Sequence, residues 1–229
     1  MGIGEFVLEE GSLIYLAYTA RIKDSGELLD TTYEEEAKKL GHYDQTKKYE
    51  PHLVAVNKGW VLKGLDEALL KAKVGDKTTV EIPPEKGFGV RDPNKIKSIS
   101  IRKFGSKADE LTIGSQIQVD DKIANVVSIG SGRVQLDYNN RLAGRTIIYD
   151  IEVTKELTEI NEMVKALIER RFKVEETTFE IAQETLTIDV PQSMELMDGL
   201  QYIKRATSND IFDLIKGIKE VIYREKYLP

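Results

Sequence analysis

The sequence predicts an α+β protein with an antiparallel sheet around a short helix, an inserted small all-β segment and a C-terminal α/β segment. Three observations predict this class. Apolar residues recur at helical spacing over residues 65–72, then alternate with polar residues over 77–82. Short strand patterns separated by turns fill residues 98–137. After residue 157, helical and strand patterns are interspersed again.

The first predicted helix runs from Leu65 to about Ala72, with acidic residues in its first turn and lysines in its last, as the helix dipole favours. Gly75 is a suitable residue to end it. The strand that follows has one apolar face and ends at Pro83-Pro84, because proline cannot donate to a sheet ladder. One helix and one strand are therefore expected in close succession.

Apolar segments flank this helix and strand. Trp60, Val61 and Leu62 form a loop before the helix, and Gly87-Phe88-Gly89 forms an aromatic tip after the strand. The stretch offers no catalytic nucleophile, so we expect a pocket that acts without a covalent step. Trp60 has two open interpretations, a half-exposed loop anchor or a part of the pocket rim.

Four separated segments, taken together, resemble one known family. The stretch 57–89 is preceded by strands at 16–22 and 28–30 joined by a turn, and followed by a box at 139–144 and a closing strand at 146–153. In order and type these segments resemble the FK506-binding-protein (FKBP) class of peptidyl-prolyl cis-trans isomerases, and within it the SlyD-like branch with its long-chain archaeal relatives. The resemblance covers about residues 7–156 and implies an FKBP-type half-barrel sheet around the helix.

The resemblance also implies a proline-binding site. We expect no cofactor, and no metal because His42 alone is a poor signal for a metal site, which needs several converging ligands. The catalytic residues that it implies are Tyr18, Asp30, Leu62, Phe88 and Tyr149. The residues that it places along the substrate are Leu29, His52, Val61 and Leu65. In this assignment the Leu62 backbone N–H grips a substrate carbonyl, Tyr18 offers a hydroxyl and Asp30 supplies a fixed carboxylate.

Two positions depart from the family pattern. Leu65 stands where single-domain members carry tryptophan, and Asn140 stands where the SlyD-like branch usually has histidine.

An apolar pocket can catalyse this isomerisation without a covalent step. The barrier to rotation about a peptide bond is about 18–20 kcal/mol and comes from resonance. A twisted transition state has lost that resonance and is less charge-separated than the planar amide, so an apolar, water-excluding pocket stabilises it selectively.

Residues 90–137 interrupt the isomerase pattern and resemble the insert-in-flap domain of SlyD-like proteins, which implies binding of unfolded polypeptide. Strands are expected at 98–102, 116–120, 122–129 and 133–137, the last three forming a meander. A client would add a strand at an exposed edge. The apolar residues predicted to contact it are Ile99, Ile101, Phe104, Ile123 and Val126, although each could instead fill the core of the insert.

Beyond Val153 about seventy residues remain. A helix is predicted through Ile160–Ile168, strands at 177–181 and 186–190, a second helix through 194–203 and a third through 211–222 that starts at Ser208 or Asn209. A segment this small buries little apolar surface alone. Its remaining apolar faces are expected either to form a homodimer or to pack on the isomerase domain of the same chain.

The predicted domains are 1–89 plus 138–156 for the isomerase, 90–137 for the insert and 157–229 for the C-terminal unit. The sequence has no cysteine, which excludes disulfides and Cys-type zinc sites and fits a cytoplasmic protein. A net charge of −6 argues against general nucleic-acid binding, and no apolar run is long enough for a membrane span.

Two functions stay open from the sequence. The first is a prolyl cis-trans isomerase that acts on unfolded or proline-containing polypeptides, with the insert recruiting the client as a folding chaperone. The second is a holding chaperone with weak or vestigial isomerase activity, which the departures at Leu65 and Asn140 keep open.

Overall fold

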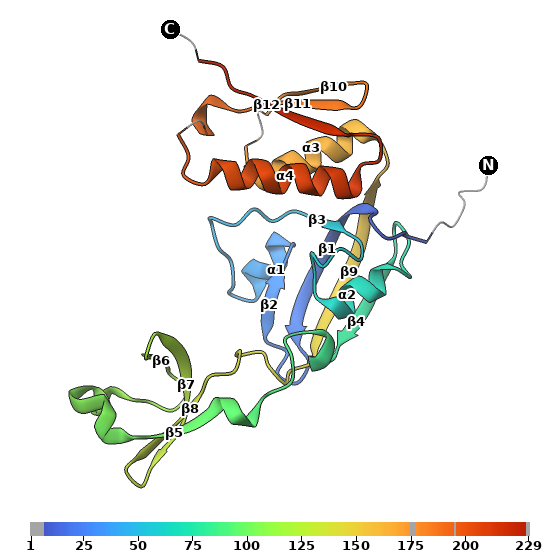
Figure 1. Ribbon diagram of the computed structural model, residues 1–229. Helices are drawn as coiled ribbons and strands as arrows, with labels where there is room; N and C mark the ends of the chain where they lie inside the picture. Colours follow the sequence, from blue (N-terminus) through green and yellow to red (C-terminus); the bar gives the residue numbers. More distant parts are fainter. Residues whose placement is uncertain (1–6, 175–176, 195, 228–229) are drawn as a thin grey trace. The chain divides into compact units, whose positions relative to one another are not determined.

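The computed structural model describes residues 7–174, 177–194 and 196–227, and the chain divides into two compact units (Figure 1). The first unit comprises the residues up to Arg21, Glu27–Glu81 and the residues from Ile148 onwards. The second comprises Ile22–Gly26 and Ile82–Ile147. The three-part division expected from the sequence stays a prediction, since the first unit groups the C-terminal segment with the N-terminal sheet.

The first unit is built on a five-stranded sheet in the order β2-β1-β9-β4, with β3 paired to β1 (Figure 1). Its strands are β1 (Leu13–Ile22), β2 (Leu28–Thr31), β3 (His52–Ala55), β4 (Lys77–Ile82) and β9 (Ile147–Leu157). Both β2 and β3 run antiparallel to β1. Two short helices, α1 (Glu34–Lys39) and α2 (Lys63–Leu69), complete this part of the unit. The predicted α+β class is confirmed.

Helix α2 lies two to three residues earlier than the sequence predicts. Its start is fixed by the Leu62 carbonyl, which accepts hydrogen bonds from the backbone N–H groups of Leu65 and Asp66. At the other end the Ala72 N–H bonds to the carbonyl of Leu69, three residues back, so the last turn tightens and leaves the α-helical pattern. The helical spacing of buried Leu65, Leu69 and Ala72 therefore continues past the end of the α-helix.

The second unit contains a four-stranded sheet in the order β5-β8-β7-β6. Its strands are β5 (Ile96–Ser100), β6 (Gln116–Val119), β7 (Lys122–Gly130) and β8 (Arg133–Asp137), with 3-10 turns at Pro84–Lys86, Pro93–Lys95 and Ile101–Glu110. The meander of β6, β7 and β8 is confirmed. The first strand of the insert lies two residues earlier than expected, because the chain turns into the 3-10 segment at Ile101.

Both hairpins of the meander have two-residue turns with left-handed backbone. Asp120 and Asp121 have φ of 47° and 61°, and Ser131 and Gly132 have φ of 49° and 71°. Positive φ at both central residues is the geometry that matches the twist of a tight hairpin, and Asp and Gly tolerate it best. Local turn chemistry thus sets the register of each hairpin next to its turn, whereas the β7–β8 pairing shifts register between Val126 and Ser128.

The C-terminal part of the first unit pairs helices with a second sheet. Its elements are α3 (Ile160–Phe172), β10 (Phe179–Ala182), β11 (Thr185–Asp189), the 3-10 turn Gln192–Met194, α4 (Leu200–Leu214) and β12 (Glu220–Arg224). Strand β11 is central, antiparallel to β10 and parallel to β12.

The predicted second and third C-terminal helices are wrong. One helix, α4, replaces them, and Ser208 lies inside it with its hydroxyl donating to the Lys204 carbonyl rather than capping a start. The chain then bends at Gly217, whose φ is 101°, and the remaining residues become β12. Ile222 pairs with Thr187 of β11, so a long-range partner overrides the helical spacing of the isoleucines.

The core of the C-terminal segment reaches into the N-terminal sheet. Leu13 of β1 and Ala55 of β3, each 0% exposed, belong to the same apolar cluster as Leu167 of α3 and Ile211 of α4. The C-terminal segment therefore packs on the sheet of its own chain.

Candidate functional site

Four side chains from four strands of the first unit converge at one place. Tyr18 of β1 donates its hydroxyl hydrogen to Asp30 of β2, with a distance of 2.6 Å between Oη and Oδ2. The ring of Tyr18 lies 5.2 Å from that of His52 of β3 and 5.5 Å from that of Tyr149 of β9, measured between centroids. The sheet thus brings together three aromatic rings and one carboxylate that are far apart in sequence.

The proton positions in this group follow from hydrogen-bond counting. His52 Nδ1 lies 3.1 Å from the Tyr18 hydroxyl oxygen. Because that hydroxyl has one hydrogen and gives it to Asp30, His52 Nδ1 carries a hydrogen and donates it to the Tyr18 oxygen. The sequence-based assignment of Tyr18 as a donor to substrate therefore competes with its bond to Asp30.

Asp30 is held by more partners than the sequence suggests. Its Oδ1 accepts from the ammonium of Lys47 and from the backbone N–H of Thr31, and the Lys47 ammonium also donates to the Thr31 carbonyl at 2.8 Å. Burial acts to raise the pKa of Asp30, but hydrogen bonds from Lys47 and Tyr18 outweigh it and hold this pKa below its ordinary value. The carboxylate is charged at neutral pH.

The three ionisable aromatic side chains of the site are held neutral. Burial, and then the hydrogen bond to Asp30, raise the pKa of Tyr18. Burial, and then the charge of Asp30, raise the pKa of Tyr149. Burial lowers the pKa of His52 against the opposing effect of Asp30. One charged carboxylate therefore sits among neutral aromatic rings.

Lys47 is a site residue that sequence reasoning missed. It lies between α1 and β3, and its ammonium reaches a carboxylate 17 positions earlier in the chain. No motif marks this lysine, so no signal in the sequence could have identified it.

Asp66 shapes the loop before α2 and was also missed. It is 4% exposed, and its carboxylate accepts hydrogen bonds from the backbone N–H groups of Asn57 at 3.1 Å and Gly59 at 3.0 Å. Both of these loop residues have positive φ, 57° and 68°. Within the described part of the chain, the Leu62 backbone N–H at the end of this loop has no hydrogen-bond partner, so an incoming carbonyl could accept from it.

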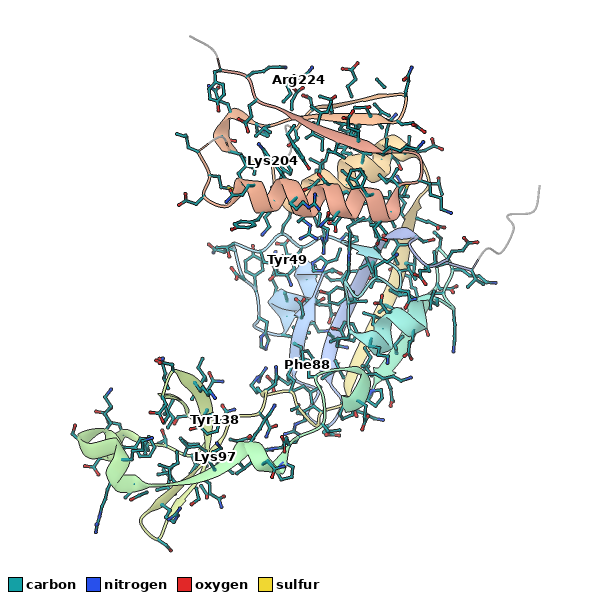
Figure 2. The ribbon with its side chains drawn as sticks, in the orientation of Figure 1. Tyr49, Phe88, Lys97, Tyr138, Lys204 and Arg224 are labelled. Atoms are coloured by element: carbon teal, nitrogen blue, oxygen red, sulfur yellow. The ribbon has the colours of Figure 1, made fainter. Side chains whose placement is uncertain are left out.

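The remaining predicted pocket residues differ in accessibility. Leu29, Val61 and Leu62 are half-buried, whereas Leu65 is 2% exposed and can contribute a floor but no rim. Phe88 belongs to the second unit, where Figure 2 shows it on the segment between β4 and β5, and it is half-buried there. Its role in the pocket stays a prediction.

The structure also has two hollows on the first unit that do not involve this group. One of about 300 Å³ is lined by Tyr33, Lys77, Thr78, Thr79, Asp150, Ile151 and Glu152. Another of about 380 Å³ is lined by Ala17, Thr32, Tyr33, Glu34, Glu35, Tyr49 and Pro51. Neither is lined by a predicted site residue.

The predicted client-contact residues of the insert fall into three groups. Val126 is 1% exposed and fills the core of the sheet, so its assignment as a contact is corrected. Ile99, Ile101 and Phe104 are half-buried and pack against that core. Ile123 is 66% exposed and is free to touch a client. Figure 2 labels Lys97, which lies in β5, and Tyr138, which directly follows β8.

The described ranges contain neither a metal-binding cluster nor a membrane-spanning helix. Across residues 7–174, 177–194 and 196–227, no three His, Cys, Asp or Glu side chains gather as a metal site would need. In the same ranges no helix has both the length and the apolar content to traverse a bilayer.

Comparison with known proteins decides the family. The model for FKBP-type peptidyl-prolyl cis-trans isomerase matches residues 5–104. A short-type peptidyl-prolyl cis-trans isomerase of Methanocaldococcus jannaschii is 32% identical over 147 residues, which are 64% of this chain and 92% of that protein. The chain belongs to the FKBP-type isomerase family. The predicted recognition is thereby confirmed.

Further matches extend the relationship along this FKBP-type isomerase. An FKBP-type 16 kDa isomerase of Escherichia coli is 34% identical over 108 residues, 45% of this chain and 72% of the relative. The SlyD isomerase of Haemophilus influenzae is 33% identical over 94 residues, 39% of this chain and 49% of the relative. The FKBP26 C-terminal family model matches residues 160–228.

Proposed function

We propose that the group around Tyr18 binds the proline ring of an unfolded polypeptide and that X-Pro bonds isomerise there without a covalent intermediate. One observation carries the proposal: Tyr18, Asp30, His52 and Tyr149 are assembled by four strands of the sheet, with a neutral aromatic wall around one fixed carboxylate. Such a site can hold a planar ring and stabilise a twisted amide, but it has no means to form an acyl intermediate.

The proposed mechanism relies on differential binding. Rings from Tyr18 and Tyr149, with Val61 and Leu65 beside them, would surround the proline and exclude water from the amide. The Leu62 backbone N–H would hold a substrate carbonyl. As the C–N bond twists, the amide loses charge separation, so an apolar surrounding favours the transition state over the planar form. Each 1.36 kcal/mol of that preference changes the rate by about tenfold.

Asp30 has a positioning role in this proposal. Its carboxylate accepts from both Tyr18 and Lys47, so it fixes the tyrosine ring and the segment that contains Lys47. Removing the carboxylate would leave the half-buried Lys47 ammonium and the Tyr18 hydroxyl without their acceptor. We expect Asp30→Ala to reduce kcat/KM on a short X-Pro peptide by roughly tenfold or more, because the Tyr18 ring would no longer be held in place, and tenfold corresponds to about 1.36 kcal/mol of transition-state stabilisation.

We further propose that the insert binds client polypeptide. Strand β6 pairs only with β7 in the described sheet, so its other edge has free backbone groups to which an extended chain could add. Exposed Ile113 and Ile123 lie close to β6 in sequence and would give that edge an apolar border. A client held there is concentrated near the isomerase site of the same molecule.

Deletion of residues 92–137 tests the two activities separately. The shortened protein should keep turnover of a short X-Pro peptide but lose most of its acceleration of the proline-limited refolding of a protein client. If neither the intact chain nor the deletion variant accelerates exchange in the short peptide, the isomerase proposal is wrong.

The second candidate function is a holding chaperone with weak isomerase activity. Leu65 favours it, since this fully buried aliphatic replaces the tryptophan floor of single-domain members. A protein that prevents client aggregation equally well with Phe88→Ala and wild type, and that barely turns over peptide, would fit this alternative.

A homodimer through the C-terminal segment and a cytoplasmic location both stay predictions. Packing of this segment on β1 and β3 already covers part of its apolar surface. Leu196 and Tyr202, 98% and 74% exposed, are the most exposed of several large apolar side chains on this segment that support a contact with a second copy. If light scattering of the full chain at micromolar concentration gives the mass of a monomer, the dimer is ruled out.

A further inference from the structure

Trp60, whose role the sequence left open, contacts the C-terminal segment. The guanidinium carbon of Arg170 in α3 lies 3.6 Å from the centroid of the Trp60 ring, which is a stacked cation–π arrangement. Arg170 is in turn paired with Asp210 of α4 at 3.3 Å, and the same carboxylate accepts two hydrogen bonds from Arg171. The partner of Trp60 is thus itself held in place from two helices.

A second tie joins the same loop to the same segment. The Lys58 ammonium lies 3.0 Å from Asp213 of α4 and 3.7 Å from Glu10, and Glu10 also accepts from the Asn57 side chain at 3.0 Å. The Lys58 side chain is 23% exposed and that of Asp213 is 54% exposed, so this ion pair is shielded from water on the lysine side only. Residues 58 and 60 are therefore attached to α4 and α3, respectively.

These ties lie immediately before the residues that the proposed mechanism uses. Trp60 is followed by Val61, which lines the proline site, and by Leu62, whose backbone N–H is available to a substrate carbonyl. On its inner side the loop is fixed by the buried carboxylate of Asp66. On its outer side, Trp60 contacts Arg170 and Lys58 pairs with Asp213, both in the C-terminal segment, while Lys58 also lies near Glu10. These contacts are possible because α3 and α4 pack on β1 and β3 in one core.

We propose that the C-terminal segment is a working part of the isomerase site, with Arg170 as a positioning residue that sets the loop carrying Val61 and Leu62 through its stack on Trp60. The ion pair between Lys58 and Asp213 is the second contact that holds this loop against the C-terminal segment. The inference rests on the proposed proline site and adds a role for a segment outside the isomerase sheet. Loosening the loop weakens its grip on substrate in both ground and transition states, so the change enters mainly through KM.

The test uses the full-length protein and a short peptide with one X-Pro bond. Arg170→Ala should raise KM by roughly three- to tenfold, the range that corresponds to a partly buried cation–π contact, with kcat changed much less. Arg170→Lys keeps the charge but lacks the planar group that stacks, so it should recover only part of the loss. Arg205→Ala, an exposed arginine on α4, is the matched control and should leave KM unchanged.

A spectroscopic readout accompanies the kinetics because Trp60 is the sole tryptophan of the chain. Its fluorescence emission should shift to longer wavelength in Arg170→Ala, as the ring loses its cover, and stay unchanged in Arg205→Ala. A shifted emission with wild-type KM would overturn the proposal. So would an unshifted emission, since the stack would then be absent in solution.

Lys58→Met provides a second test in case Arg170→Ala does not fold. It loosens the same loop by removing the ion pair with Asp213, so it should also raise KM. Thermal unfolding shows which variants are folded at the assay temperature, and a folded Lys58→Met with wild-type KM would contradict the proposal. Wild-type protein that fails to turn over the peptide would instead refute the isomerase site itself, which keeps the two failures distinct.

Discussion

The insert and the C-terminal segment are two additions to one FKBP-type sheet, and they differ in how their cores are made. The buried cluster of the insert consists of residues of its own strands, namely Val119, Ala124, Val126, Val134 and Leu136. The buried cluster of the C-terminal segment includes Leu13 of β1 and Ala55 of β3. One addition is self-contained, whereas the other shares its core with the sheet it joins.

The base of the insert is closed by polar contacts. Asp137 is 5% exposed and accepts from the backbone and side chain of Asn139 and from Arg91. The Asn139 side chain also bonds to the backbone N–H and carbonyl of Asp92. The segment that enters the insert at residues 91–92 and the segment that leaves it at residues 137–139 are thus bonded to each other within the second unit. An element closed in this way can be removed or can unfold separately, whereas loss of the C-terminal segment strips apolar cover from the isomerase sheet.

The largest expected effect comes from removing each addition. Truncation after Leu157 exposes Leu13 and Ala55, so the remaining chain should lose cooperative unfolding and aggregate. The variant without residues 92–137 should unfold cooperatively near the wild-type midpoint. Circular dichroism during heating of both variants measures this difference. A truncated chain that melts cooperatively at the wild-type temperature would remove the distinction drawn above.

Replacing one buried leucine in each core by alanine should also distinguish the two cores, with a smaller effect on stability than the deletions. Leu167 of α3 and Leu136 of β8 are both 0% exposed, and replacing either by alanine should lower the local free energy of unfolding by about 2–5 kcal/mol. Leu167→Ala should destabilise β1 and β3 as well, while Leu136→Ala should affect only the insert. Hydrogen exchange resolved by segment measures both, and equal loss of protection in β1 from the two variants would contradict the shared core.

The response to pH should also differ between the two units. The folded pKa of His52 lies below its unfolded value of about 6.5 because burial disfavours the charged ring. Between these two values the unfolded chain binds more protons, so the first unit should lose stability as the pH falls below about 6.5. The charges around His52 are those of Asp30, Lys47 and Glu50, and the pKa of Asp30 is held below its ordinary value.

The insert should show no such loss, since the two histidines of the chain are His42 and His52. Urea unfolding at pH 7.5 and 5.5, followed by segment-resolved exchange, should give a drop for the first unit alone. His52→Gln should reduce that drop, whereas exposed His42→Gln should keep it. An unchanged pH response in His52→Gln would show that another group is responsible.

The smallest effect is expected at an exposed ion pair of the insert. The side chains of Lys103 and Asp120 are 53% and 77% exposed, so water and salt screen the pair. Lys103→Ala should leave the midpoint of insert unfolding within experimental error. Lys58→Ala breaks a more shielded pair, between the loop before α2 and α4, and should measurably lower the unfolding midpoint of the first unit. Equal effects at the two sites would remove the contrast.

Local patterns gave much of the fold. The hairpin of β1 and β2, helix α2 with β4, and the meander of the insert all follow from spacing and turn residues that act over a few positions. The order of these patterns was also enough to indicate the family, which the relatives confirm. The candidate site was partly predictable for the same reason, because the resemblance had assigned Tyr18, Asp30 and Tyr149 to it and the sheet brings these three side chains together.

The rest depended on contacts between residues distant in the chain. Ile222 became a strand residue because β11 offered a parallel edge, and the ammonium of Lys47 reached Asp30 across an irregular segment. Trp60 found its partner in Arg170, more than a hundred positions later. Periodicity and turn chemistry are local properties that the sequence alone determines. Which surfaces meet is decided when the whole chain packs, because burial and charge pairing depend on the side chains that other segments bring, and so the tertiary structure alone linked the C-terminal segment to the isomerase loop.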